Sequence, residues 1–279
     1  MSAPRAGRSH HLRLFILLTM RLARLLVIVL VSAAFCQAPS ETRFGLEAHR
    51  GLCNRFPENS IPAFREAGKS RAYSGMETDV QMSADGVLVC MHDDTIDRTV
   101  NAHGRISEYT YRELRKMRLS GGRGWNDNYL GKLRIPTFRQ YLKICRKYGL
   151  IPYVELKCLS EEGVRKTIQT LDAMGFKGKY VLTSFNLESL DQASKYTTAH
   201  KEYMCTDYTN SDVDCCFERG YVVRADASRL TPELAAYAKS KGLILECFGI
   251  PVSGAEVVER LVSLGVSGGT CDDYEGLGL

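Results

Sequence analysis

Two histidines and three acidic residues stand where they could bind a metal ion and act on a phosphate group. His49 and His92 each follow a short apolar stretch. Glu77 and Asp79 are two residues apart, and in a strand such residues point to the same face, so both carboxylates can bind one cation. Glu155 provides a third carboxylate in a later apolar stretch. The pattern predicts an oxygen-ligated divalent metal beside an acid and a base.

The chemistry that these residue types favour is phosphodiester hydrolysis. Carboxylates are hard ligands that suit Mg²⁺ or Ca²⁺ better than zinc, which prefers nitrogen and sulfur. A cation together with Arg50 and Lys157 would offset the charge of the phosphate, while one histidine accepts a proton and the other supplies one. The alternative is that the acids only pair with basic residues and that each histidine is a satisfied core residue. Five such residues at strand ends favour the catalytic interpretation.

Three further positions have two interpretations each. Glu58 and Asn59, in the sequence PENS before a predicted helix, could cap that helix or belong to the site. Phe185, which closes the apolar stretch YVLTSF, could line a substrate pocket or belong to the core. The glycine-rich runs at 121–124 and 268–269 match no phosphate-loop spacing.

Short apolar segments alternate with amphipathic ones from about residue 44 onward. Helices are predicted between the apolar segments at, for example, 61–70, 136–149, 161–175 and 231–242, several with Pro, Ser or Thr at the start and Gly at the end. Eight strands with intervening helices indicate an α/β fold, a closed TIM-type (β/α)8 barrel, with an open doubly wound sheet as the alternative. The predicted strands are 44–48, 75–80, 151–156, 180–185, 202–206, 221–225, 243–248 and 267–271.

One segment breaks this alternation just after the second predicted strand. The turn at 82–86 leads directly into the apolar stretch VLVCMHD at 87–93. Five residues are too few for a parallel crossover, so a small hairpin insertion is predicted, which returns His92 to the rim of the barrel near the carboxylates. Residues 94–134, rich in Arg and Gly and containing the only tryptophan, Trp125, are predicted to form a further insertion over the same rim.

The first 38 residues are predicted to be a leader, and 39–279 the catalytic domain. Five arginines and no acid accompany the apolar run at 25–35, which is typical of a secretory signal peptide. Cleavage would make the protein secreted, lumenal or periplasmic. An uncleaved signal anchor is the alternative, in which the N-terminal segment associates with a membrane.

The net charge of +5 bears on possible binding partners, and the ten cysteines bear on the redox state of the compartment. The leader carries the excess charge, and the remaining chain has equal numbers of basic and acidic side chains, so charge gives no reason to expect a nucleic acid partner. No CxxC motif is present, which disfavours thiolate zinc and redox motifs. In an oxidising compartment some cysteines would pair.

The order of the motifs resembles that of the glycerophosphodiester phosphodiesterases over about residues 44–275. The motifs are AHRG, PENSIPAF, ETDV, DGVLVCMHDDTIDRT, IPTF, VELK, TSF and GVSGGTCDDY, of which HRG, ExD and HD-x-x-x-x-RT in this order are the specific ones. The resemblance implies a TIM-type barrel that uses Mg²⁺ or Ca²⁺ to hydrolyse glycerophosphodiesters to glycerol 3-phosphate and an alcohol. It also implies that a glycerol hydroxyl attacks phosphorus and that water then opens the cyclic phosphate.

The resemblance assigns roles residue by residue. It implies His49 and His92 as the acid/base pair. The other roles that it implies are metal ligation by Glu77, Asp79 and Glu155, and phosphate contact by Arg50 and Lys157.

Two departures from the family pattern leave the alcohol group open. Family members often carry Trp-Thr-Val-Asn on the seventh strand where this chain has Glu246-Cys247-Phe248-Gly249, so Phe248 would replace an aromatic wall of the pocket. The closing helix is expected to be short or absent. The expected substrate is a small glycerophosphodiester, with a lysophospholipid, cleaved by a lysophospholipase D-type reaction, as the alternative. A non-catalytic binding protein on the same barrel is the third candidate; loss of a histidine or a ligand would indicate it, and none is lost.

Overall fold

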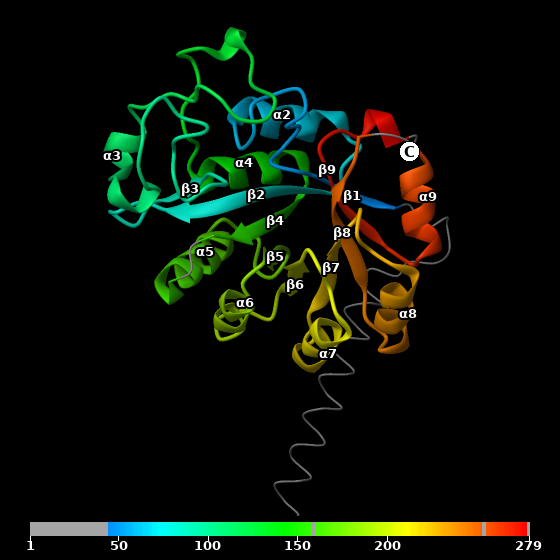
Figure 1. The fold of residues 1–279 in the computed structure, drawn as a ribbon. Coiled ribbons are helices and arrows are strands. Elements are labelled where there is room, and N and C mark those ends of the chain that lie inside the picture. The colour runs from blue at the N-terminus through cyan, green and yellow to red at the C-terminus, as the bar shows by residue number, and fades with distance from the viewer. Residues whose placement is uncertain (1–43, 158–159, 253–254, 278–279) are drawn as a thin grey trace, which may run out of the picture. The chain divides into compact units, whose positions relative to one another are not determined.

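Eight parallel strands close into a barrel (Figure 1). The structure is a computed structural model that describes residues 44–157, 160–252 and 255–277, so the predicted leader lies outside the described residues. Strand β1 pairs in parallel with both β2 and β9, which closes the sheet and excludes the open doubly wound alternative. The barrel strands are β1 (Gly45–Ala48), β2 (Gly75–Met82), β4 (Ile151–Leu156), β5 (Val181–Ser184), β6 (His200–Cys205), β7 (Val222–Asp226), β8 (Leu245–Ile250) and β9 (Gly268–Cys271).

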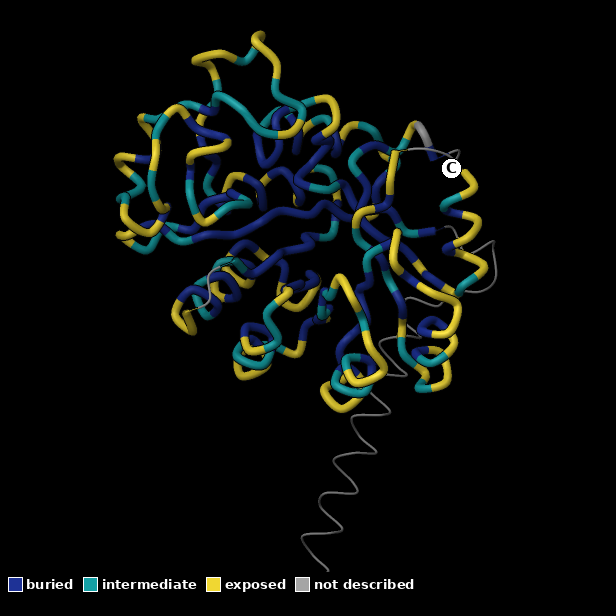
Figure 2. Tube along the Cα trace, viewed as in Figure 1, coloured by how far each residue is buried: buried dark blue, intermediate teal, exposed yellow. Residues whose placement is uncertain are grey.

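Helices connect the barrel strands and cover their outer side. Their outward surfaces are exposed and their inward surfaces buried (Figure 2), as expected of amphipathic helices on a core. Thr137 caps α4 in a capping box with Gln140, and Gly149 ends this helix in the left-handed conformation. The helices are α2 (Ile61–Ser70), α4 (Phe138–Tyr148), α5 (Glu161–Ala173), α6 (Leu187–Ala193), α7 (Asn210–Arg219), α8 (Pro232–Ser240) and α9 (Ala255–Ser263).

The predicted hairpin and the predicted insertion are both present. Strand β3 (Leu88–Cys90) pairs antiparallel with the end of β2. The chain then forms η1 (Ile106–Glu108), α3 (Tyr111–Leu114) and η2 (Asp127–Tyr129) before α4 begins. This insertion has a small apolar core of its own, made of Val89, Met91, Ile96, Val100, Ile106, Leu114, Leu119 and Ile135. After β9, the described chain ends in the short turn η3 (Glu275–Leu277).

Neither disulfides nor membrane-spanning helices are found among the described residues. Eight cysteines are free thiols, so the expected pairing is not seen between them, and Cys36 and Cys158 lie outside the described residues. None of the described helices is long and apolar enough to cross a membrane.

A buried charged group occupies the interior of the barrel. The Arg224 guanidinium donates to Glu47 at 2.6 Å and to Glu246 at 2.9 Å, and it also pairs with Glu202. The ring of Tyr153 lies 5.5 Å from the same guanidinium. Burial raises the pKa of Glu47 to about 8, against the opposing effect of Arg224. These residues come from five strands around the barrel, so the Arg224 guanidinium links strands on different sides of the barrel through ion pairs.

Replacing Arg224 with Met is expected to lower the free energy of unfolding by about 3–5 kcal/mol, because three glutamates, two of them buried, then lose their shared cation. Urea unfolding followed by circular dichroism measures this change. The matched control is Arg65→Met, which removes an exposed arginine and should leave the unfolding midpoint almost unchanged. Equal midpoints for the two variants would contradict a stabilising role for Arg224.

Candidate active site

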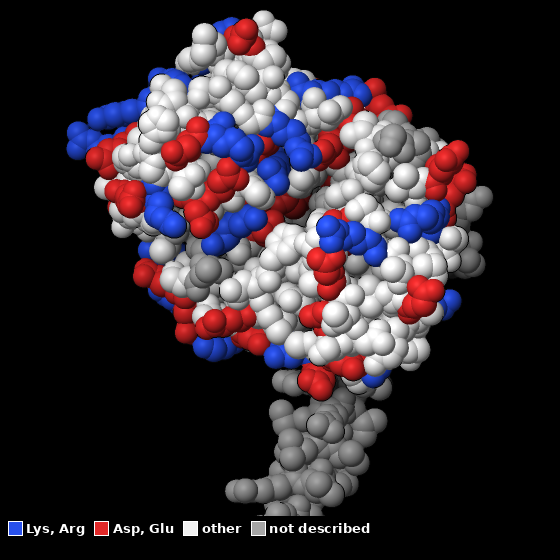
Figure 3. Space-filling view, viewed as in Figure 1, with Lys and Arg blue, Asp and Glu red and all other residues white. Residues whose placement is uncertain are grey.

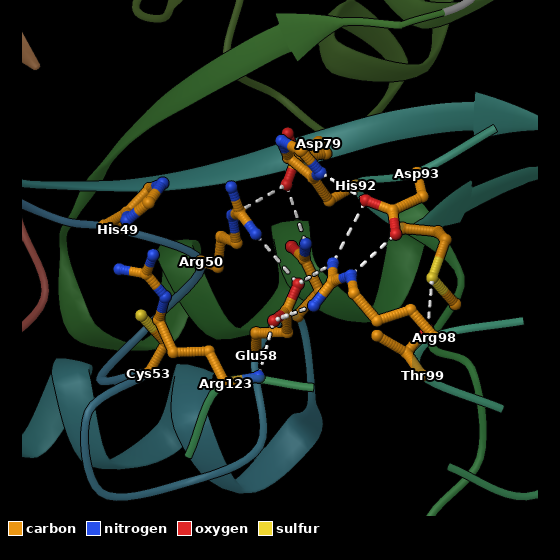
Figure 4. Close-up of polar contacts among 12 residues, drawn as sticks. His49, Arg50, Cys53, Glu58, Asp79, His92, Asp93, Arg98, Thr99 and Arg123 are labelled. Carbon is orange, nitrogen blue, oxygen red and sulfur yellow. Dashed lines mark hydrogen bonds and ion pairs between the residues drawn. The ribbon is translucent and has the colours of Figure 1, made fainter. Parts of the chain in front are cut away.

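The predicted site residues meet at the carboxyl ends of the barrel strands, where TIM barrels carry their active sites. His49 directly follows β1, and Glu77 and Asp79 lie on β2. Asp79 pairs in register with Glu155 on β4, so these two side chains share the inner face of the sheet. The antiparallel pairing of β3 with β2 brings His92 back beside Asp79, as the hairpin prediction required (Figure 4).

Three carboxylates form a group that could hold a cation. Glu77, Asp79 and Glu155 each offer an oxygen, and these oxygens lie within 4.8 Å of one another. Glu77 Oε1 and Asp79 Oδ1 are buried without a hydrogen-bond partner. Buried polar atoms nearly always have a hydrogen-bond partner. Two carboxylate oxygens without one, in the same group of acids, therefore fit a site for a cation. An all-oxygen donor set matches Mg²⁺ or Ca²⁺.

The electrostatics of this group favour an added positive charge. Burial, followed by repulsion from Asp79 and Glu155, raises the pKa of Glu77 well above its usual range. Burial and Asp79 likewise raise the pKa of Glu155 to about 7. Burial alone would also raise the pKa of Asp79, but Arg50 and Lys157 outweigh it and lower that pKa. A divalent cation would stabilise all three in the charged form.

The two predicted phosphate contacts, Arg50 and Lys157, lie at the carboxylate group. The Arg50 backbone N–H donates to Glu77 Oε2 at 2.8 Å, and its side-chain Nε lies 3.4 Å from Asp79 Oδ2. Lys157 pairs with Glu155, and its Nζ lies 3.5 Å from Asp79 Oδ1. The Arg50 and Lys157 side chains therefore lie within the site, and their contact with a phosphate stays a prediction.

Each histidine has an aspartate on its Nδ1 atom. His49 Nδ1 lies 2.6 Å from Asp272 Oδ1, and His92 Nδ1 lies 2.5 Å from Asp93 Oδ1. A carboxylate at Nδ1 fixes the ring orientation and leaves Nε2 for proton transfer. Burial is the main cause that lowers the pKa of His49. The sequence prediction missed Asp272; the available signal was an acidic residue directly after the last barrel strand.

Cys53, His49 and Asp272 form a second group that could hold a metal ion, because their possible ligand atoms lie within 4.8 Å of one another. The Cys53 thiol donates to Asp272 at 3.4 Å, and the Arg123 guanidinium pairs with the same carboxylate. Burial raises the pKa of the Cys53 thiol, which disfavours the thiolate that a metal would need. The group is better explained as a hydrogen-bonded support for His49.

Glu58 is the centre of a network that joins the insertion to the site. It accepts from Arg50 at 2.8 Å, from both Arg98 amino groups at 2.8 Å, and from the Arg123 backbone N–H at 2.6 Å. Despite burial, these donors, Arg98 first, lower its pKa to about 2. Arg98 also donates to Asp93 at 2.6 Å and so supports His92. Arg98 and Arg123 were not predicted as site residues.

Asn59 contacts the carboxylate group and does not cap the following helix. Its amide donates to Asp79 Oδ2 at 2.7 Å, and its oxygen accepts from the Thr78 hydroxyl at 2.7 Å. The cap of α2 is Ser60, whose hydroxyl accepts from the Ala63 backbone N–H at 3.3 Å. The capping interpretation of Asn59 is therefore wrong, because its backbone is left-handed at φ 51° and directs the amide toward Asp79.

Two aromatic residues face each other at the mouth of the barrel. The rings of Phe185 and Phe248 meet edge to face with centroids 5.3 Å apart, although β5 and β8 are not neighbouring strands. Phe185 is 46% exposed, so the interpretation as a core aromatic is wrong for this residue. Lys157 Nζ lies 6.0 Å from the Phe185 ring, which places the aromatic pair beside the carboxylate group.

Comparison with known proteins places this arrangement in a family. The glycerophosphoryl diester phosphodiesterase family matches residues 49–275. The glycerophosphodiester phosphodiesterase of Caldanaerobacter subterraneus is 31% identical over 236 residues, which cover 82% of this chain and 94% of that protein. A glycerophosphodiester phosphodiesterase of Bacillus subtilis is 28% identical over 242 residues, which cover 79% of this chain and 80% of that protein.

The fold is also that of solved phosphodiesterases. The structure of an Oleispira antarctica phosphodiesterase in complex with the product sn-glycerol-3-phosphate matches with a TM-score of 0.75 at 22% identity, over 84% of this chain and 95% of that one. The family match extends over nearly all of the described residues and includes the carboxylates, both histidines and Asp272. The chain therefore belongs to the glycerophosphoryl diester phosphodiesterase family and is an enzyme that hydrolyses glycerophosphodiesters.

Proposed function

We propose that this enzyme is metal-dependent and releases glycerol 3-phosphate and an alcohol by acid/base catalysis with His49 and His92. The observation that carries the proposal is the pair of orphaned buried oxygens on Glu77 and Asp79, next to two histidines that each have an aspartate on Nδ1. The family uses a divalent metal ion, and the donor set favours Mg²⁺ or Ca²⁺. The relative from Oleispira antarctica, solved with sn-glycerol-3-phosphate, supports this product.

Five side chains would provide the charge that binds the cation and the phosphate. Glu77, Asp79 and Glu155 would hold the cation, which when bound would stabilise negative charge on the phosphate oxygens. Arg50 and Lys157 add positive charge at the same place.

Proton transfer would fall to the two histidines. Burial lowers the pKa of His49 and so favours its neutral form, which fits the base that would accept a proton from the attacking hydroxyl. His92, held by Asp93, would then supply the proton to the leaving alkoxide. Phe185 and Phe248 would contact the alcohol group.

A product assay tests the proposal. Purified enzyme is incubated with glycerophosphocholine, glycerophosphoethanolamine or lysophosphatidylcholine, and phosphorus NMR identifies the phosphate product. Glycerol 3-phosphate is expected from the first two substrates, with the free alcohol in equal amount. Release of a phosphorylated alcohol and free glycerol would contradict the proposed position of bond cleavage.

A lysophospholipase D-type reaction is the second candidate. The observation that favours it is the half-exposed Phe185 with Phe248 at the mouth, where an acyl chain could lie. In the same assay, lysophosphatidic acid from lysophosphatidylcholine, at a rate above that with glycerophosphocholine, would identify this activity. The third candidate, a non-catalytic binding protein, is wrong, because the chain belongs to a family of enzymes.

A further inference from the structure

Five basic side chains on the insertion form a surface that we call the basic surface. They line a cavity of about 310 Å³ and are Arg112, Arg115, Lys116, Arg118 and Arg134. In the described part of the chain none of them has an acidic partner within 4.0 Å, whereas the insertion's Arg98, Arg105 and Arg123 all do. Lys and Arg side chains project from the edge of the molecule beside α3 (Figures 1 and 3).

The basic surface shares no residue with the candidate active site. Arg98 and Arg123 point inward and bind Glu58 and Asp272 at the barrel mouth. The one acid of α3, Glu113, is engaged by the hydroxyl and the backbone N–H of Thr110, 2.7 and 2.9 Å away, and so caps the helix. Five basic side chains accompany this one acid, so the surface keeps a net positive charge, although the body of the chain is balanced in charge. Clustered like charge costs free energy unless an anionic partner binds there.

An exposed apolar side chain borders this surface. The Arg118 side chain donates to the Gly131 carbonyl at 3.1 Å, so the neighbouring Leu130 lies at the edge of the basic surface. Leu130 is 66% exposed, the highest value among the large apolar residues that the structure describes. Basic side chains beside an exposed apolar residue are typical of protein surfaces that lie on a bilayer.

We propose that the basic surface docks on a bilayer that contains anionic phospholipid, with Leu130 reaching into the headgroup region. Arginine suits this role because its planar guanidinium can bind a phosphate through two hydrogen bonds. A nucleic acid would also supply phosphates, but the exposed Leu130 has no partner on that ligand. Docking would hold the insertion, and the site that it contacts through Arg98 and Arg123, at the lipid surface. The inference goes beyond the proposed catalysis and does not require it.

The test is co-sedimentation of the full chain with vesicles of phosphatidylcholine alone or mixed with phosphatidylglycerol. Only the mixed vesicles are expected to bind the wild type, and binding should weaken as salt is added. The triple variant Arg112→Gln/Arg115→Gln/Lys116→Gln should lower the partition coefficient about 100-fold, since each basic residue near an anionic surface contributes about fivefold. Leu130→Ser should lower it roughly tenfold.

The matched control removes the same charges from a different face. Lys143→Gln/Arg146→Gln/Lys147→Gln changes three exposed basic residues of α4 and should keep wild-type binding. Both triple variants should hydrolyse glycerophosphocholine at the wild-type rate, which shows that they are folded. Equal loss of binding in the two triples, or no binding of the wild type to mixed vesicles, would overturn the proposal. So would binding of a short DNA duplex or inorganic phosphate to the basic surface in preference to the vesicles.

Discussion

Replacing His49 or His92 with alanine is expected to lower kcat about 10²- to 10⁴-fold, while the chain stays folded. Each imidazole is held through Nδ1 by an aspartate, at 2.6 Å for His49 and at 2.5 Å for His92, which leaves Nε2 for the proposed proton transfer. Loss of the base leaves the attacking hydroxyl protonated, and loss of the acid leaves a poor alkoxide leaving group. Steady-state hydrolysis of glycerophosphocholine measures the change.

The control for both variants is a histidine with a similar partner outside the site. His103 Nδ1 lies 3.1 Å from Asp97 Oδ1, and its side chain is 89% exposed. His103→Ala removes a His–Asp pair without touching the barrel mouth, so its kcat should equal that of the wild type. A His49 or His92 variant that is folded by circular dichroism and retains a rate near that of His103→Ala would refute the acid/base assignment.

Removal of divalent cations is expected to abolish hydrolysis, and added Mg²⁺ or Ca²⁺ to restore it. The reason is that Glu77 and Asp79 carry buried oxygens without a hydrogen-bond partner, and that burial and mutual repulsion disfavour charge on Glu77 and Glu155. Treatment with EDTA followed by metal titration measures this effect. Isothermal titration calorimetry of the metal gives a readout that does not depend on turnover.

A ligand variant sharpens this test. Glu77→Gln should raise the half-saturating metal concentration by at least about tenfold, since even residues that only support metal ligands typically contribute 10- to 100-fold in affinity. The control Glu66→Gln changes an acid on the surface of α2, paired with Lys69, and should leave metal affinity unchanged. Full activity in excess chelator, with no metal found by elemental analysis, would exclude an essential cation.

Much of the fold could be predicted because its signals are local. Apolar periodicity gave all eight barrel strands, and the five-residue turn at 82–86 required the antiparallel β3. The i, i+2 spacing of Glu77 and Asp79 was enough to place both carboxylates on one face of β2. Helices α6, α7 and α9 were not predicted individually, since α6 spans only seven residues and the polar surfaces of α7 obscure its apolar face.

The sequence by itself determined the barrel and the family, and it predicted five side chains that the structure brings together at the barrel mouth, because strand spacing and motif order lie within short segments. The tertiary structure decided which side chains support that centre. Asp272 meets His49 across 223 residues only because β9 pairs with β1, and Arg224 contacts Glu47 only because the barrel is closed. The basic surface, without an acidic partner among the described residues, likewise became visible only once the insertion had folded, since a run of arginines does not reveal which of them an acid will neutralise.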